Sequence, residues 1–261
     1  MTPSPKPGRL ASFLRPWSMI WMSICLHWEA LTDALRRDGL TALMHPHRIR
    51  DAAFAKLLSI TSSGFIAFED TTIVPSLVCA AKGVVLELGP GPGNQIHRFD
   101  TTAVQYIYGV EPNRYLKEDI DAKLEKHGLT DRYKLLICGI EDSNVLRGEG
   151  ISEGTLDAIL CIQVLCAVKD PKSVMKEVWK LLKPGGKFIF WEHGCSRDRW
   201  TGLAQVLTNP AWNTFVGCHL TRSVLADILN SGEWENPGDI EEPEEPVSLP
   251  PRVQGVLVKK A

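Results

Sequence analysis

The chain has 261 residues, of which 44% are hydrophobic and 23% are charged, and its formal net charge is −2. This composition is that of a globular protein with a sizeable core, and it excludes a chain that is disordered throughout. The near-neutral charge offers no basic surface of the kind that nucleic-acid-binding proteins carry. We therefore expect a small-molecule substrate and no nucleic acid.

The chain contains seven cysteines, and no two of them have C-x-x-C spacing. The odd number argues against a disulfide framework, and the spacing argues against a structural zinc site. The sequence thus predicts free cysteines in a reducing, cytoplasmic compartment and no bound metal. Cys166 and Cys218 are interpreted as packing residues.

The N-terminal part is expected to be a proline-rich, disordered tail over residues 1 to 9, followed by a helix from about Pro16 to Arg37. The apolar stretch within this helix is too short to span a bilayer, which needs about 20 apolar residues. Two roles stay open for residues 10 to 31, and the first is favoured: a cap over a substrate pocket, or peripheral contact with a membrane. Both rest on an apolar face at helical spacing, formed by Trp17, Ile20, Trp21, Ile24 and Trp28.

Two more helices are predicted, from about His47 to Leu58 and from about Thr71 to Ala80. After residue 83, short apolar runs alternate with helices, which indicates right-handed βαβ units on a parallel sheet. The predicted parallel strands are Val84–Leu88, Tyr106–Val110, Tyr133–Cys138, Leu156–Ile162 and Lys187–Trp191, with helices at Arg114–His127 and Pro171–Leu182. In the tail we expect a helix at Leu220–Ser231 and a closing antiparallel pair of strands at Trp234–Ile240 and Val253–Lys259.

A glycine-rich loop follows the first predicted strand directly and has the sequence Glu87-Leu88-Gly89-Pro90-Gly91-Pro92-Gly93. Glycines there let the backbone turn sharply and approach a ligand closely. Glu111 follows the second strand, 18 positions after Gly93 (111 − 93). An acidic residue at about this sequence separation from such a loop can accept hydrogen bonds from both hydroxyls of a ribose. The two features together predict a site for a nucleoside-containing cofactor.

The glycine spacing distinguishes between cofactors. A dinucleotide-binding fingerprint has G-x-G-x-x-G, whereas this loop has G-x-G-x-G with Asn94 in place of the last glycine. The carboxylate of Glu87 would repel a pyrophosphate, but it suits the free ammonium group of S-adenosylmethionine. We therefore expect S-adenosyl-L-methionine, and a nicotinamide-dependent oxidoreductase is the disfavoured alternative.

The residues from Val84 to Trp191 resemble the class I S-adenosylmethionine-dependent methyltransferases. The resemblance rests on the glycine loop and on three further segments in the family's order: Gly109–Asn113, Leu156–Cys161 and Leu181–Lys187. It implies a Rossmann-like, doubly wound α/β fold with a seven-stranded, mostly parallel sheet and an antiparallel C-terminal strand. The domains would then be a tail and helical cap over residues 1–82 and a methyltransferase domain over 83–261, with a substrate cap insertion around 194–222.

The predicted cofactor-binding residues are Glu87, Gly89, Gly91, Gly93, Glu111, Pro112, Ile140, Glu141 and Gln163. One position departs from the family's pattern, because Ile140 stands where an acidic residue often reaches the adenine amino group. Glu141 or Asp142 would have to replace that acidic residue, with Ile140 as an apolar wall.

A narrower resemblance connects this sequence with the methyltransferase-like thiol methyltransferases. It is carried by Val164–Val168, Glu192-His193, Asn209–Trp212 and Gly217–Arg222. It implies a membrane-associated enzyme that methylates small alkyl thiols. From the residues alone, the acceptor atom stays open among S, O, N and C, on an apolar substrate, and the oligomeric state stays open too.

Two histidines are the candidate general bases. His193 directly follows the fifth strand, at the sheet edge where a doubly wound fold binds its ligands, and His219 lies in the later cap. Trp212 and Trp200 are candidates for the wall of an apolar pocket. The alternative function is a cofactor-binding protein of this fold that does not transfer methyl groups, such as a cyclase or a binding partner of another protein.

Overall fold

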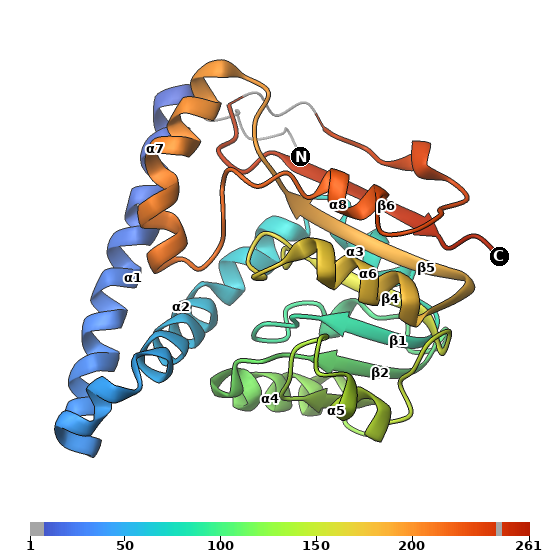
Figure 1. Cartoon of the computed structure of the whole chain (residues 1–261). Helices are drawn as coiled ribbons and strands as arrows, with labels where there is room; N and C mark the ends of the chain where they lie inside the picture. The colour runs from blue at the N-terminus through green and yellow to red at the C-terminus, as the bar shows by residue number, and fades with distance from the viewer. Residues whose placement is uncertain (1–7, 244–246) are drawn as a thin grey trace.

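The computed structural model describes residues 8–243 and 247–261, and its centre is a sheet of six strands in the order β3-β2-β1-β4-β5-β6 (Figure 1). Strands β1 to β5 are parallel, and β6 runs antiparallel to β5. Their bounds are Gly83–Leu88, Val104–Val110, Tyr133–Leu136, Leu156–Ile162, Leu182–His193 and Arg252–Val258. The expected doubly wound α/β fold with an antiparallel C-terminal strand is confirmed, and the strand order reverses between β1 and β4.

Alternation along the strands divides the core into two layers. Leu86 and Ile159 belong to one buried cluster, whereas their neighbours Val85 and Leu160 belong to the other. Because successive side chains of a strand point to opposite faces, continuous apolar runs such as those of β1 and β4 bury both faces of the sheet. The sheet is therefore enclosed between two layers of helices.

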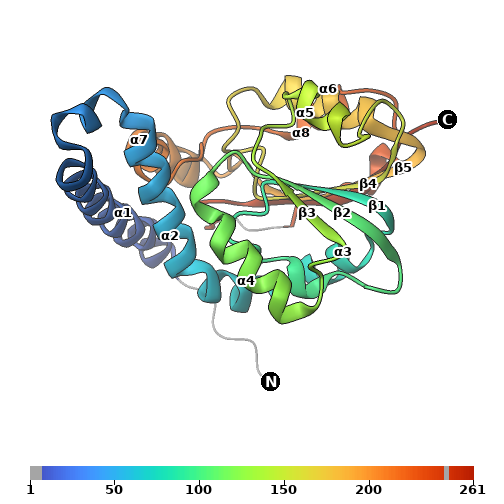
Figure 2. The same cartoon turned by 90° about the horizontal axis from the view of Figure 1, so that it is seen from below.

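Figure 2 shows these layers edge-on, with α3 and α4 on one face and α5, α6 and α8 on the other. The helices are α3 Val74–Cys79, α4 Lys117–His127, α5 Ser143–Gly148, α6 Pro171–Leu181 and α8 Leu225–Leu229, with short 3-10 helices at Ile96–Arg98, Arg114–Leu116 and Pro237–Asp239. The Asp170 side chain accepts a hydrogen bond from the Ser173 amide at the start of α6, where Pro171 occupies the first turn. Gly128 ends α4 in the left-handed conformation, as its position predicts.

A third group of helices stands beside the sheet rather than on its faces. It consists of α1 Arg9–Asp38, α2 Pro46–Glu69 and α7 Arg199–Phe215, with the 3-10 helix Gly39–Met44 joining the first two. Helix α1 lies against both α2 and α7 (Figures 1 and 2). The hydroxyl of Ser23 on α1 donates a hydrogen bond to the carbonyl of Phe215, which fixes α1 to the end of α7.

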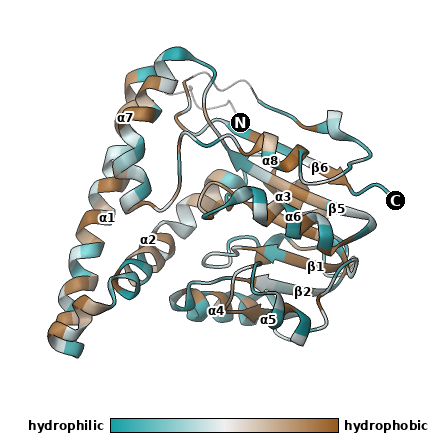
Figure 3. Cartoon of the chain, viewed as in Figure 1, coloured by the Kyte–Doolittle hydropathy of each residue, from teal (hydrophilic) through white to brown (hydrophobic). Residues whose placement is uncertain are grey.

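Helix α1 has two apolar faces. The buried one includes Pro16, Ile20, Ser23 and Leu26, whereas a second one is open to solvent and carries Leu10, Leu14, Trp17, Trp21 and Trp28. The predicted face that joined Ile20 to the tryptophans is thus split, because the helix packs through Ile20 and leaves Trp21 and Trp28 68% exposed. Figure 3 shows the hydrophobic residues along α1 and α7 as well as those in the sheet. No helix in the described part of the chain is long and apolar enough to cross a membrane.

The seventh strand expected at Trp234–Ile240 is not present among the described residues. Only two isolated bridges remain, Trp234 with Lys259 and Glu241 with Gln254, and a 3-10 helix begins at Pro237 between them. The Asn236 side chain replaces a strand here, since it donates to the Val256 carbonyl and accepts from the Val258 amide. Proline has no amide hydrogen for a ladder, so pairing stops at this point.

Other boundaries differ as well. Helix α2 continues past Leu58 to Glu69 because contacts with the glycine loop hold its second half, and α7 was not predicted. The helix expected at Leu220–Ser231 is reduced to α8, because the Leu220 amide donates to Asn209 on α7 instead of starting a helix. Of the tail expected to be disordered, residues 1–7 lie outside the described residues, and α1 begins at Arg9.

Candidate functional site

A cleft of about 2310 Å³ opens at the carboxyl ends of β1, β2 and β4. Its floor is the glycine loop with the strand ends, and its walls come from α1, α2 and α7. Switch points of doubly wound sheets bind ligands at this edge. The cleft therefore has one end at the predicted cofactor residues and another between α1, α2 and α7.

The three glycines of the loop have left-handed backbone conformations, with φ of 53° at Gly89, 57° at Gly91 and 77° at Gly93. A Cβ at Gly89 would lie 3.0 Å from Cγ2 of Val164, and one at Gly93 would lie 2.6 Å from Cδ1 of Ile96. No atom lies within 4 Å of the corresponding point at Gly91, which lines the cleft. Gly89 and Gly93 thus allow the turn to form, and Gly91 leaves bare backbone for a ligand to approach.

Glu87 is buried at the end of β1 and lines the cleft. Its Oε2 accepts a hydrogen bond from the Tyr133 hydroxyl at 2.8 Å, and its Oε1 has no partner. Burial raises the pKa of the Glu87 carboxyl to about 7, and the hydrogen bond from Tyr133 opposes this rise. An unpartnered buried carboxyl oxygen suits a cationic group, and the ammonium of S-adenosylmethionine is one.

Glu111 is fixed beside the loop by two backbone amides. Its Oε2 accepts from the Gly91 amide at 3.2 Å, and its Oε1 accepts from the Asn113 amide at 2.9 Å. Burial raises the pKa of this carboxyl to about 7, against the effect of both hydrogen bonds. Since each carboxylate oxygen has a second lone pair, Glu111 can still accept hydrogen bonds from two ribose hydroxyls.

The residues predicted to lie at the adenine are Ile140, which is buried, and Glu141, which is exposed, and both line the cleft together with Pro112. A Cβ at Gly139 would lie 2.4 Å from Oε2 of Glu141, so the carboxylate of Glu141 folds back over this glycine. Asp142 accepts a hydrogen bond from the Gly139 amide at 2.9 Å and thereby closes the turn. Ile140 is placed to form an apolar wall, and Glu141 is the acidic group at its rim.

Gln163 follows β4 and lines the cleft in a strained conformation. Its φ is 59°, and it is the one non-glycine residue with a positive φ in the part of the chain that the structure describes. Such strain persists where surrounding contacts enforce it, and it is common at functional sites. Here the backbone amide of Gln163 donates to the Trp191 carbonyl at 2.8 Å, and the Gln163 side chain donates to Oε1 of Glu69 at 3.4 Å.

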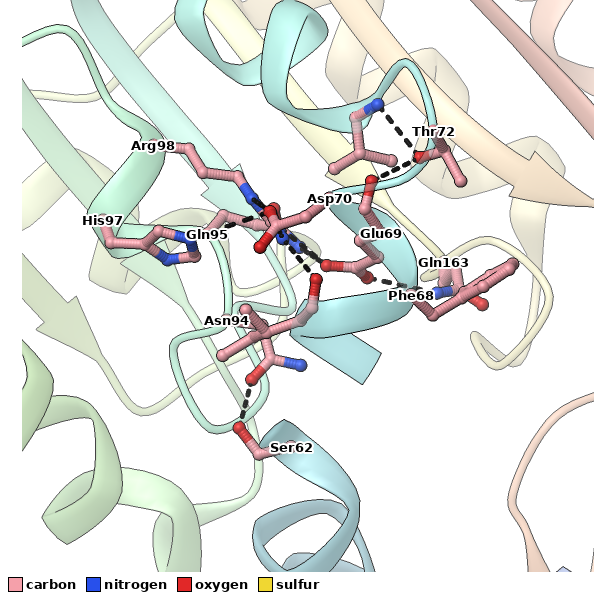
Figure 4. Close-up of polar contacts among 12 residues, drawn as sticks. Ser62, Phe68, Glu69, Asp70, Thr72, Asn94, Gln95, His97, Arg98 and Gln163 are labelled. Carbon is pink, nitrogen blue, oxygen red and sulfur yellow. Dashed lines mark hydrogen bonds and ion pairs between the residues drawn. The ribbon is translucent and has the colours of Figure 1, made fainter. Parts of the chain in front are cut away.

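Glu69 at the end of α2 connects the cap to the glycine loop, and this role was not predicted (Figure 4). Its Oε2 accepts from Arg98 at 2.7 Å and from Gln95 at 3.0 Å, and the Glu69 and Arg98 side chains are each only 3% exposed. Arg98 also binds Asp70 at 2.7 Å. No local pattern marks this pairing, since the partners come from different elements. These contacts therefore tie the end of α2 to the segment that follows the glycine loop.

A second contact joins α2 to the same loop. The Ser62 hydroxyl donates to Oδ1 of Asn94 at 2.6 Å (Figure 4). Lys123 donates to the same oxygen at 3.1 Å. Asn94 stands where a dinucleotide-binding loop has its last glycine. In this chain its side chain is used to dock α2.

The end of the cleft predicted to receive the acceptor contains a group of sulfur and nitrogen atoms. Cys166, His193 and Cys218 line the cleft, and the Cys218 Sγ lies 3.5 Å from the His193 Nε2. The Trp212 indole, which also lines the cleft, donates to the Cys218 Sγ at 3.0 Å. The hydrogen bond from Cys166, with help from His193, lowers the pKa of the Cys218 thiol, and the same hydrogen bond raises the pKa of Cys166.

The other predicted acceptor residues lie elsewhere. His219 is not among the residues that line the cleft, although its amide donates to the Cys166 carbonyl at 3.0 Å. Burial lowers the pKa of the His219 imidazole. Trp200 is 66% exposed on α7 and is likewise outside the cleft lining. Of the predicted histidine and tryptophan candidates, the structure brings His193 and Trp212 together.

Two charged residues position the Cys166 loop, and sequence analysis missed both roles. Glu192 is fully buried, and its Oε1 accepts from the amides of Val164 at 2.6 Å and Leu165 at 3.0 Å. Arg222 donates to three carbonyls of the same loop, those of Leu165, Cys166 and Val168. The resemblance to the thiol methyltransferases includes both residues, in the segments Glu192-His193 and Gly217–Arg222. It did not indicate what either side chain contacts.

Comparison with known proteins agrees with this geometry. Residues 86–190 match the family described as "Methyltransferase domain". The segment contains the glycine loop, Glu111, Ile140, Glu141 and Gln163. Residues 86–190 thus form a methyltransferase domain of the class I, S-adenosylmethionine-dependent type.

Curated relatives of this methyltransferase include two human proteins. It is 27% identical to human thiol S-methyltransferase TMT1B over 58% of this chain and 60% of that protein. It is 39% identical to human thiol S-methyltransferase TMT1A over 28% of this chain and 30% of that protein. The matches thus span less than two thirds of the length of these relatives.

Among solved structures, the methyltransferase resembles an O-methyltransferase family protein from Burkholderia thailandensis. The TM-score is 0.58 at 14% identity, and the match covers 100% of this chain and 74% of the other. At this identity, the likeness concerns the fold. The fit of S-adenosylmethionine rests instead on the bare backbone at Gly91, the orphaned Oε1 of Glu87 and the fixed carboxylate of Glu111.

Proposed function

We propose that this methyltransferase transfers the methyl group of S-adenosylmethionine to the sulfur of a small, apolar thiol. The observation that carries the proposal is the continuity of one cleft, from the carboxylates of Glu87 and Glu111 to the group around His193. The names of the human relatives favour a thiol among the acceptor classes. When bound, the cofactor supplies an electrophilic methyl group on a sulfonium.

The apolar character of the acceptor follows from the cap. The cleft is walled there by Met19 and Met22 of α1, Phe54 and Phe65 of α2, and Trp212 of α7. Methionine and aromatic side chains form adaptable apolar pockets. A small alkyl or aryl thiol would exchange water for these contacts, so we propose that residues 1–82 and the insertion around 194–222 together form the acceptor pocket.

The residues of the chain have separate tasks in the transfer. Glu87 and Glu111 hold the cofactor, and Gln163, fixed by Glu69, lies at the strand end between the cofactor and acceptor parts of the cleft. An acceptor thiol must lose its proton, since the thiolate is the nucleophile. His193 is the imidazole that lines the cleft, so it is the proposed means of this activation. Positioning in such a cleft can contribute about 7–11 kcal/mol.

We further propose that the protein contacts a membrane peripherally through residues 10–31. The support is the exposed stripe of Leu10, Leu14, Trp17, Trp21 and Trp28, because tryptophan-rich faces favour the headgroup layer. The neighbouring helix α7 exposes a second apolar set, consisting of Trp200, Leu203, Val206 and Leu207. The wall and the membrane contact use different faces of α1. We propose that the protein acts in the cytoplasm, a reducing compartment.

The test is an assay of S-adenosylhomocysteine release across a panel of thiols, phenols, amines and carboxylic acids. We expect turnover with apolar thiols and the corresponding methyl thioether as product. Glu111→Ala should weaken cofactor binding by about 1–3 kcal/mol, the range for hydrogen bonds to a charged group. Binding of S-adenosylhomocysteine without any methylated product would favour a cofactor-binding protein that does not methylate. Preferential NAD binding would indicate an oxidoreductase.

A further inference from the structure

Three potential metal ligands meet at the acceptor end of the cleft, and the methyl-transfer scheme above gives two of them no task. The ligand atoms of Cys166, His193 and Cys218 all lie within 4.8 Å of one another. The Cys218 Sγ to His193 Nε2 distance is 3.5 Å. In a tetrahedral zinc site with bonds of roughly 2.3 Å to sulfur and 2.0 Å to nitrogen, neighbouring ligand atoms are roughly 3.5–3.8 Å apart. The group therefore needs only a small contraction to bind such an ion.

The three ligands come from separate parts of the chain. Cys166 lies in the loop after β4, His193 ends β5, and Cys218 follows α7. The sequence contains no C-x-x-C spacing because the fold, and not a local motif, brings these residues together. The absence of this spacing, on which the expectation of no metal rested, therefore does not bear on a site of this kind.

The surroundings hold the ligands in place. Glu192 accepts hydrogen bonds from the amides of Val164 and Leu165, and Arg222 donates to the carbonyl of Cys166 itself. The Trp212 indole donates to the Cys218 sulfur, a contact that would stabilise a thiolate ligand. Cys166 and His193 are 1% and 4% exposed, so both ligands are ordered by a packed environment.

The number and place of the ligands distinguish a catalytic metal from a structural one. Structural zinc ions have four protein ligands, whereas catalytic zinc ions have three and keep a position for water or substrate. Here the three ligands all line the cleft, and the apolar acceptor wall includes Trp212, the neighbour of Cys218. A fourth position would therefore be supplied from the cleft.

We propose that Cys166, His193 and Cys218 bind a Zn²⁺ ion that takes the thiol acceptor as its fourth ligand. The proposal rests on the proposed function as a thiol methyltransferase. In this arrangement the ion activates the acceptor thiol, and His193 binds the ion instead of acting as a free base. A Zn²⁺ ion with two thiolates and one neutral imidazole has no net charge. It can therefore accept a third thiolate, that of the acceptor, beside the cationic cofactor.

The step balances in atoms and charge. The metal lowers the pKa of the bound acceptor thiol, and its proton leaves to solvent. The thiolate sulfur then attacks the methyl carbon of S-adenosylmethionine, so a new carbon–sulfur bond forms and the sulfonium carbon–sulfur bond breaks. The bonding electron pair remains on the sulfur of S-adenosylhomocysteine. The products are the methyl thioether, S-adenosylhomocysteine and one proton.

The experiment measures metal binding directly. The full-length protein is purified without chelator, its zinc content is measured by mass spectrometry, and the ion is then replaced by Co²⁺ for absorption spectroscopy. We expect one zinc per chain and cobalt bands typical of tetrahedral thiolate coordination. Cys166→Ser and Cys218→Ser should weaken zinc binding at least tenfold and reduce the thiolate-to-cobalt band. An apolar thiol should shift the cobalt spectrum, because it enters the coordination sphere.

Cys79→Ser is the matched control, since Cys79 is an exposed cysteine at the end of α3. Near-ultraviolet circular dichroism and S-adenosylhomocysteine calorimetry show whether each variant is folded. Wild-type protein without stoichiometric zinc affinity overturns the proposal, as do folded Cys166 and Cys218 variants that bind zinc like the control. A disulfide between Cys166 and Cys218 in the freshly purified, active protein would overturn it too.

Activity separates this proposal from the one on which it rests. A metal-free enzyme that methylates thiols at the wild-type rate would overturn the zinc site and leave the proposed function intact. Zinc bound at the three residues, with a cobalt spectrum that responds to thiols but no thiol methylation, would support the site and overturn the proposed function. Loss of thiol methylation on zinc removal, restored by zinc addition, supports both.

Discussion

Tyr133 on β3 reaches across β2 to hydrogen-bond Glu87 on β1, with 2.8 Å between the phenol oxygen and Oε2. The contact is possible because Gly109 lies between them: a Cβ at that position would be 2.1 Å from the Tyr133 hydroxyl. Gly109 is paired with Glu87 in the β1–β2 register. One glycine in β2 thus lets a tyrosine of the next strand hydrogen-bond the buried Glu87 carboxyl and oppose the rise in its pKa that burial causes.

Gly109→Ala tests this arrangement. The new methyl group would displace a fully buried tyrosine, and overpacking of this kind costs about 1–3 kcal/mol. We expect the free energy of unfolding in urea to fall by that amount and S-adenosylhomocysteine to bind more weakly. Gly148→Ala is the control, since it ends α5 with open space around it, and it should be near neutral. Equal effects of the two variants would contradict the role of Gly109.

The pH dependence of cofactor binding follows from the pKa of Glu87 and of Glu111, which burial raises to about 7 in both cases. The ammonium and sulfonium of S-adenosylmethionine favour the ionised carboxyls, so binding below pH 7 must release protons. We expect affinity to be level above about pH 8 and to fall by up to tenfold per pH unit and per carboxyl below about pH 7. Calorimetry from about pH 5.5 to 8.5 measures this.

Glu87→Gln should flatten part of that profile while weakening binding at high pH, because the amide is neutral throughout. The residual pH dependence would then belong to Glu111. A wild-type affinity that is constant through pH 7 would show that neither carboxyl is protonated in the cofactor-free protein.

The buried pair of Glu69 and Arg98 should matter more than any surface pair. Arg98→Ala leaves the Glu69 carboxylate buried without its cation, which costs about 3–5 kcal/mol. The glycine loop should also become more mobile, and hydrogen exchange of the Asn94 and Gln95 amides should accelerate. Arg36→Ala, at an exposed pair on α1, is expected to change stability by less than about 1 kcal/mol. A similar loss of stability in both variants would contradict the prediction that the Glu69–Arg98 pair links α2 to the glycine loop.

The two proposed roles of α1 can be separated by its two faces. Replacing Trp17, Trp21 and Trp28 by glutamine alters the exposed stripe and leaves the cleft lining intact. We expect the triple variant to lose co-sedimentation with liposomes and to keep wild-type turnover of a water-soluble thiol. Met19→Ala together with Met22→Ala, on the cleft face, should have the opposite effect, with a raised KM and unchanged sedimentation. Liposome binding that survives the tryptophan substitutions would contradict the membrane proposal.

The sequence was informative where local chemistry decides the structure. The five parallel strands are apolar runs bounded by turn residues, and the glycines from Gly89 to Gly93 predict a tight turn after a buried strand. The prediction of a seventh strand was wrong because the Asn236 side chain makes hydrogen bonds in place of a backbone ladder. Strand propensities do not reveal that a side chain takes over backbone hydrogen bonds.

At the candidate site, the placement of Glu87 and Glu111 could be predicted from the sequence, whereas that of Cys166 and Cys218 could not. Glu87 and Glu111 follow strands whose carboxyl ends meet at one edge, so topology places them together. Cys166 and Cys218 lie in segments whose proximity depends on how α7 docks on α1, which the sequence does not reveal. The contacts of Glu192 and Arg222 with the Cys166 loop are similarly long-range and have no local pattern.

The central claim is thiol methylation, and the most direct measurement follows the transferred atoms. Methyl-labelled S-adenosylmethionine is incubated with the enzyme and an equimolar mixture of an apolar thiol, phenol, amine and carboxylic acid, and the labelled products are identified by mass spectrometry. We predict that the label appears in the methyl thioether, in one-to-one ratio with S-adenosylhomocysteine, and that Glu111→Ala lowers both together. Label in the ether, amine or ester instead of the thioether, or bound cofactor with no labelled product, would contradict the account.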